Sequence, residues 1–188
     1  MSSEAQVIDF NAIFNAYIAA NQKTWAVNRD LTVGASEIFG CLRSVWFKKR
    51  GKEFGFEKDE GEQDWGAMER GNMIENHYVV PAMKFLPKPM NLIFAGDDQN
   101  TFVLGKNSAT PDGLIVGLDP SKPLIIRSKS GDDIIVDSIG ADCICFEIKS
   151  IDPRAVLLEE RAKHHGQTQV QLGLIRALTE YKPVMSII

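Results

Sequence analysis

Two carboxylates and a lysine in this 188-residue chain have the spacing of a hydrolytic site. Glu147 and Lys149 lie two positions apart in the segment CFEIKS, and Asp112 follows a proline in the segment ATPDG. Residues two positions apart in a strand share a face, so Glu147 and Lys149 are expected to point the same way. If the strands that carry Asp112 and Glu147 are neighbours, the three side chains form a candidate active site.

A divalent cation would explain two carboxylates in one cleft, because like charges repel unless a cation lies between them. Hard carboxylate oxygens favour Mg²⁺ or Mn²⁺. We expect Asp112 and Glu147 to hold one ion, with the Ile148 carbonyl as a further ligand and a second ion shared with Glu75. Such an ion would polarise a scissile phosphate while Lys149 orients the attacking water. The structural alternatives are a simple Pro-Asp-Gly turn and an amphipathic strand with its polar face in water.

Helices are expected where apolar residues recur at helical spacing. They cover residues 8–21, 36–51, 62–80 and 159–181. Ser36 is a candidate N-cap for the second helix, which Gly51 is expected to stop. Pro81 is expected to end or kink the third helix, and Pro183 to end the last. Trp46 is expected to pack in the core, with stacking on a base as the alternative.

Strands are expected in the β-rich segments between and after these helices. They cover residues 91–94, 101–104, 113–117 and 141–150, with a hairpin inside 118–140 and a further strand in VMSII. This order indicates an α/β fold with a mixed central sheet flanked by helices. Residues 1–188 are expected to form a single domain. The chain stops within a strand-like segment, so either the protein ends there or a C-terminal portion is absent.

Charge and cysteine content limit the classes of function. The net charge is −4, so any DNA contact would be local, with the basic stretch FKKRGK (47–52) as the candidate. No apolar run is long enough to span a membrane, and no signal-peptide pattern opens the chain. Three cysteines indicate free thiols in a reducing, cytoplasmic compartment, and no iron–sulfur cluster is expected.

Several motifs resemble those of one nuclease superfamily. Pro111-Asp112 with Glu147-Ile148-Lys149 is similar to the PD-(D/E)XK signature. In HHGQTQVQ, Gln167 and Gln171 share a helix face, for which ordinary helix surface is the structural explanation.

The order of these motifs resembles the phage lambda-type alkaline exonucleases, also called YqaJ-type viral recombinases. Arg29 and Ser36 match an R-x6-S-E motif, whose Arg and Ser bind the terminal 5′-phosphate in that family. Glu75 matches the metal-site Glu of G-x-x-x-E-N, and Gln167 matches the active-site Gln of A-Q-x-Q. The resemblance spans about residues 29–188.

The resemblance implies a restriction-endonuclease-like core and an Mg²⁺- or Mn²⁺-dependent exonuclease acting 5′→3′ on duplex DNA ends, in phage-type recombination or repair. It implies catalytic and metal-binding roles for Asp112, Glu75, Glu147, Ile148, Lys149 and Gln167, and DNA-binding roles for Arg29, Ser36 and Arg43. It adds a homo-oligomeric ring, a single-strand annealing recombinase as partner, and the cytoplasm of a bacterium or phage-infected cell.

Two other interpretations stay open. The segment GCLRSVWFKKRG (40–51) looks like the C-x-R helix of RecB-type and CRISPR-associated nucleases, which implies a different polarity or endonuclease activity. Many of those enzymes add a four-cysteine iron–sulfur site, and only Cys41 has a matching place. The third interpretation is a non-catalytic protein of the same fold that binds DNA ends. The presence of every expected catalytic residue disfavours it.

Overall fold

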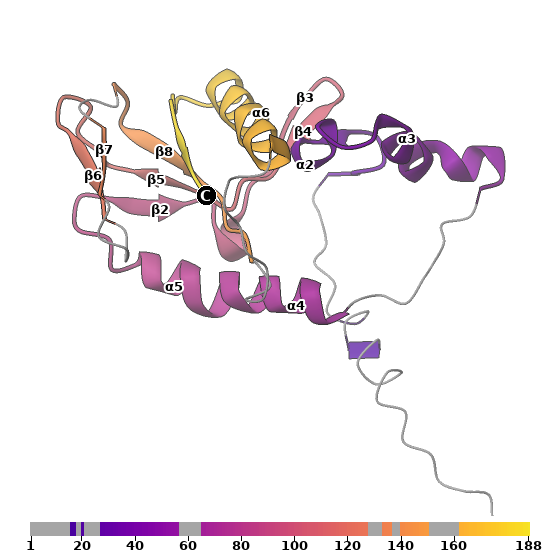
Figure 1. Ribbon diagram of the computed structural model, residues 1–188, viewed down its shortest axis with the longest axis horizontal. Helices are drawn as coiled ribbons and strands as arrows, with labels where there is room; N and C mark the ends of the chain where they lie inside the picture. Colours follow the sequence, from indigo (N-terminus) through magenta and orange to yellow (C-terminus); the bar gives the residue numbers. More distant parts are fainter. Residues whose placement is uncertain are drawn as a thin grey trace, which may run out of the picture.

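The computed structural model describes residues 16–17, 20, 27–56, 65–127, 133–136, 140–150 and 162–188, without the side chains at 65, 67 and 68. Within these ranges the chain is a mixed α/β structure whose strands form three small sheets (Figure 1). The helix expected over residues 8–21 lies, except for three positions, outside the described residues. None of the described helices is both long and apolar enough to cross a membrane.

A four-stranded sheet with the strand order β2-β5-β8-β9 lies at the centre. Its members are β2 (Asn91–Ile93), β5 (Gly113–Val116), β8 (Cys143–Phe146) and β9 (Ser186–Ile187). Strand β5 is antiparallel to both β2 and β8, whereas β9 is parallel to β8. A strand was expected in each of these segments, and the structure confirms all four with shorter bounds. The sheet is therefore mixed, and β5 and β8 are direct neighbours.

A second sheet joins three short strands, and a hairpin forms the third sheet. These are β1 (Val33–Gly34), β3 (Phe102–Leu104) and β4 (Asn107–Ala109), then β6 (Leu124–Ile126) and β7 (Ile134–Val136). The structure confirms β3 and the β6–β7 hairpin. Strands β1 and β4 escape sequence-based prediction because each is very short, and Asn-Ser-Ala lacks the β-branched and aromatic residues that favour strands.

The buried core lies on both faces of β8. Cys143 and Cys145 belong to a cluster with Leu172 and Ile175 of helix α6 (Ala162–Leu178). Ile144 belongs to a second cluster that includes side chains from the β6–β7 hairpin. Strand β8 is therefore a central strand, and the alternative of an amphipathic strand with one face in water is wrong.

The helix expected from Ser36 to Gly51 is in fact two helices, α2 (Ala35–Ile38) and α3 (Leu42–Arg50). The N-cap of α2 is Gly34 rather than Ser36, which is exposed in the first turn. Gly51 does end α3, although the chain continues as the 3₁₀ turn η1 (Gly51–Phe54). Trp46 on α3 is 43% exposed, so the expectation of a core position for this side chain is wrong.

The third expected helix does not end at Pro81. Helix α4 (Trp65–Ile74) continues through the π-helical segment η2 (Glu75–Val79) into α5 (Val80–Met83). In η2 the Val80 N–H donates to the Glu75 carbonyl, five residues back. The ordinary i→i−4 ladder is already interrupted there, so a proline without an N–H can follow directly. Figure 1 shows α4–α5 and α6 along different sides of the central sheet.

Candidate functional site

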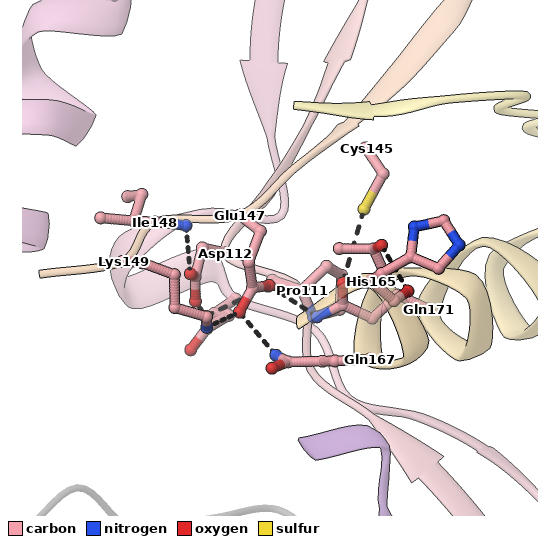
Figure 2. Close-up of polar contacts among 11 residues, drawn as sticks. Pro111, Asp112, Cys145, Glu147, Ile148, Lys149, His165, Gln167 and Gln171 are labelled. Carbon is pink, nitrogen blue, oxygen red and sulfur yellow. Dashed lines mark hydrogen bonds and ion pairs between the residues drawn. The ribbon is translucent and has the colours of Figure 1, made fainter. Parts of the chain in front are cut away.

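Asp112 and Glu147 meet because the two strands that carry them are paired. Gly113 at the start of β5 pairs with Phe146 at the end of β8. Asp112 directly precedes the first of these residues and Glu147 directly follows the second, so both lie at one end of the strand pair. The Ile148 N–H donates to Asp112 Oδ2 at 2.7 Å, which ties the two segments together (Figure 2). The structure therefore confirms the convergence that the sequence analysis required.

The Glu147 carboxylate is buried, with 3% of the residue exposed. Its Oε1 accepts a hydrogen bond from Gln167 Nε2 at 2.5 Å, and its Oε2 accepts one from Gln171 Nε2 at 2.6 Å. Lys149 Nζ also donates to Oε1 and forms an ion pair with it. A buried carboxylate is costly unless it is paired and hydrogen-bonded, and these three donors meet that requirement.

Lys149 lies on the same side of the chain as Glu147, as the strand spacing predicts. Its side chain is 26% exposed, so the ammonium lies between the buried carboxylate and solvent. The amides of α6 approach Glu147 from the helix, as Figure 2 shows. The site thus has a closed side formed by α6 and a more open side at Lys149 and Asp112.

Burial and neighbouring negative charges disfavour the ionised form of the Asp112 carboxyl. Burial, together with the charges of Glu147 and Glu75, raises the pKa of this carboxyl to about 7. The Ile148 N–H and the Lys149 ammonium act in the opposite direction and lower the pKa. A divalent cation at this position would stabilise the ionised form, because it supplies the missing positive charge.

Glu75 lies at the first position of the π-helical segment η2, in the helix that runs along a different side of the central sheet from α6 (Figure 1). One turn earlier, a methyl group added to Gly71 would lie 3.6 Å from Ser150 Oγ, so α4 passes directly beside the segment after β8. The Glu75 charge acts on Asp112 in the structure. The small residue at position 71 therefore allows α4 to pass beside the segment after β8, one turn before Glu75.

The donor set fits a hard divalent cation held by few protein ligands. Among the residues that the structure describes, no three His, Cys, Asp or Glu side chains form a ready metal-binding group. Mg²⁺ commonly uses only one or two carboxylates and completes its octahedron with waters and substrate phosphates. Asp112 and Glu147 supply that pair. The Ile148 backbone contributes its N–H to Asp112 in this arrangement.

Two glutamines at the site were not among the expected site residues. Gln171 is fully buried and bonds Glu147, and its Oε1 lies 4.0 Å from Cys145 Sγ. Its spacing of four from Gln167 was the signal, but a polar helix face is more often solvent-exposed. Gln99 Nε2 donates to Asp112 Oδ1 and to the Pro111 carbonyl, both at 3.1 Å. No sequence pattern marks Gln99.

Two of the expected DNA-binding residues, Arg29 and Ser36, lie in a separate group around α2. Glu37 accepts the Gly34 N–H at 2.9 Å and pairs with Lys49 at 3.0 Å. These contacts, with the nearby Arg29 charge, lower the pKa of Glu37 although burial opposes them. Ser36 is exposed on α2, a helix of only four residues. The dipole of so short a helix contributes little to the phosphate site expected at the N-terminus of α2.

Arg43 does not join this group. It belongs to α3, where its guanidinium lies 5.7 Å from the centre of the Phe47 ring. Helix α2 is nevertheless brought close to the catalytic candidates, because Phe39 packs directly on Gly166 of α6, one residue before Gln167.

The three cysteines are free: Cys41 is exposed, and Cys143 and Cys145 are buried in β8. Comparisons of this chain with protein-family models, with curated proteins and with solved structures find no match in any of the three.

Proposed function

We propose that this chain is a metal-dependent deoxyribonuclease of the PD-(D/E)XK type, which degrades linear duplex DNA from its ends in the 5′→3′ direction. The observation that carries the proposal is the convergence of Asp112, Glu147 and Lys149 at the ends of two paired strands. A restriction-endonuclease-like core is the fold that belongs with this proposal. The raised pKa of Asp112 supports a site that binds a cation.

Asp112 and Glu147 would hold Mg²⁺ or Mn²⁺, with Glu75 and the Ile148 carbonyl as further candidate ligands. When bound, the ion would polarise the scissile phosphate and offset the charge that develops on its oxygens. The protein's own role is to keep the two carboxylates in one orientation. Gln171 and Gln167 do so for Glu147 from α6, and the Ile148 N–H does so for Asp112.

Lys149 and Gln167 are the residues proposed to orient the attacking water and to stabilise its negative charge. Both contact Glu147 Oε1, so an ammonium and an amide converge on one carboxylate oxygen. The Gln167 amide would orient a water near that oxygen, and the Lys149 ammonium would stabilise negative charge on this water. The partial exposure of Lys149 gives this water a route from solvent.

End recognition is proposed for Arg29 and Ser36, with Arg43 as a further phosphate contact. The packing of Phe39 on α6 supports this, because it places the α2 region next to the helix that bears Gln167. The proposal includes duplex DNA ends as substrate, further copies of the chain in a ring, and a single-strand annealing recombinase as partner. It places the protein in the cytoplasm of a bacterium or phage-infected cell.

A time course on end-labelled linear duplex with Mg²⁺ tests this proposal. We expect nucleotides to be released first from the 5′-labelled end, faster from a 5′-phosphate than from a 5′-hydroxyl, and closed circular DNA to stay intact. Equal cutting of closed circles would favour the RecB-like, endonucleolytic alternative. Tight end binding without degradation in Mg²⁺ or Mn²⁺ would contradict the proposal and favour a non-catalytic end-binding protein.

A further inference from the structure

Helix α3 and the turn η1 form a projecting arm that packs little against the rest of the described chain. Val45 is the one buried residue of α3. Figure 1 shows α3 extending beyond α2, on the side away from the central sheet. The proposed function uses only Arg43 of this arm, although the arm holds the densest group of aromatic and basic residues in the described chain.

Two of the three aromatic residues of the arm, Trp46 and Phe54, are exposed. The Trp46 and Phe54 ring centroids are 5.2 Å apart, with the rings tilted by 36°. Trp46 is 43% exposed and Phe54 is 59% exposed. Phe47 contacts Trp46 edge-on, with the two ring centroids 4.9 Å apart. Trp46 and Phe54 thus form an exposed aromatic pair, held in place by a third ring.

Basic residues are concentrated in the segment that carries this aromatic pair. Residues 42–56 contain five basic side chains and one acidic side chain, in a chain whose net charge is −4. Lys49 and Arg50 are engaged with Glu37 and Glu53. The side chains of Lys48 and Lys52 are exposed and make no hydrogen bond or ion pair within the described part of the chain.

We propose that the Trp46–Phe54 pair binds single-stranded DNA, with bases stacking on the rings and Lys48 and Lys52 contacting phosphates. Exposed rings in a basic segment suit unpaired bases, whose faces are free, better than a duplex, whose bases are already stacked. A protein partner is less favoured, because the centres of protein interfaces are depleted of lysine. The inference rests on the proposed function, since removing one strand of a duplex leaves the other unpaired.

Binding of labelled oligothymidylate, measured by fluorescence anisotropy in EDTA, tests the inference without any cleavage. Trp46→Ala is expected to weaken binding by about tenfold or more, the loss of one stacked base. Leu42→Ala is the matched control, because Leu42 is an exposed apolar residue of the same helix without a ring. It is expected to bind like the wild type. Trp46→Phe keeps a ring and is expected to retain most of the affinity.

The salt dependence of oligothymidylate binding measures the contribution of Lys48 and Lys52. Lys48→Ala and Lys52→Ala are each expected to reduce the slope of log affinity against log salt by roughly 0.7, the value for one phosphate contact on a single strand. An unchanged slope in both variants would remove the two lysines from the inference. Wild-type affinity in Trp46→Ala, or an equal loss on blunt duplex, would overturn the stacking role.

The single-strand site and the proposed active site can be refuted independently of each other. Glu147→Gln is expected to lose cleavage and to keep oligothymidylate binding, because the carboxylate lies outside the arm. If Glu147→Gln cleaves like the wild type while Trp46→Ala loses binding, the proposed active site is wrong and the single-strand site stands. If Glu147→Gln loses cleavage while Trp46→Ala and Trp46→Phe both bind like the wild type, the single-strand site is wrong and the active site stands.

Discussion

Replacing Asp112 with Asn should make the metal-free protein less sensitive to pH. In the folded protein, burial and the charge of Glu147 raise the pKa of Asp112 from its ordinary 3.8 to about 7. Between these values the folded state holds a proton that the unfolded chain has released. The free energy of unfolding therefore falls as pH rises, by about 1.4 kcal/mol per pH unit, and levels off above the folded pKa.

Between about pH 5 and pH 7 the free energy of unfolding of the wild type falls along this slope, and it is nearly constant from there to pH 8. The wild type therefore loses up to about 3 kcal/mol that Asp112→Asn does not lose. Asn keeps the shape and can still accept the Ile148 N–H through its side-chain oxygen. The cost of an altered contact with Gln99 is independent of pH, so it cancels when the two pH values are compared. The relevant quantity is the difference in pH dependence between the two proteins.

Urea unfolding in EDTA, followed by circular dichroism at both pH values, measures this difference. Added Mg²⁺ at the higher pH should stabilise the wild type by about 1.4 kcal/mol at tenfold excess over its dissociation constant, and should not stabilise Asp112→Asn. If the free energy of unfolding depends on pH in the same way for both proteins in EDTA, the argument is refuted, because the pKa of Asp112 would then not be raised in the folded state.

Four further outcomes are expected. Gln171→Ala should reduce Mg²⁺-dependent activity by about 10- to 100-fold by leaving a buried carboxylate oxygen unpaired, whereas the exposed Gln169→Ala should not, as initial rates on linear duplex would show. Gly166→Ala would place a methyl group 2.3 Å from a packed ring and should cost about 1–3 kcal/mol in urea unfolding. Gly173→Ala on the same helix meets nothing within 4 Å and should stabilise by about 0.5–1 kcal/mol. Cys41 alone should react quickly with a thiol reagent in the native protein, since burial raises the pKa of the two thiols on β8 to about 11 and about 12.

The positions of Asp112 and Glu147 could be predicted because strand periodicity and a Pro-Asp-Gly turn are local signals. Their meeting depended on the pairing of β5 with β8, which no local pattern encodes. The sequence analysis could state this pairing only as a condition. Gln167 was expected, but Gln171 was not, because whether a polar helix face lies against a buried carboxylate or in water depends on the sheet beneath it.

The helices show a similar limit. Pro81 indicates a helix end by local rules, yet the π-helical segment before it removes the hydrogen bond that the proline would have broken. The apolar spacing over residues 36–51 predicts one helix, whereas capping of Gly34 by Glu37 starts a short one and Cys41 begins another. Trp46 was expected in the core because its spacing fits an apolar stripe, but little of the described chain packs against α3.

The central claim is that Asp112, Glu147 and Lys149 form a cation-dependent nuclease centre. The most direct test is the rate of nucleotide release from linear duplex in Mg²⁺, measured for the wild type, Glu147→Gln and Lys149→Ala, with circular dichroism to confirm that each is folded. The account predicts degradation by the wild type, its loss in both folded variants, and no degradation by any of them in EDTA. Degradation at the wild-type rate by both variants would contradict the account.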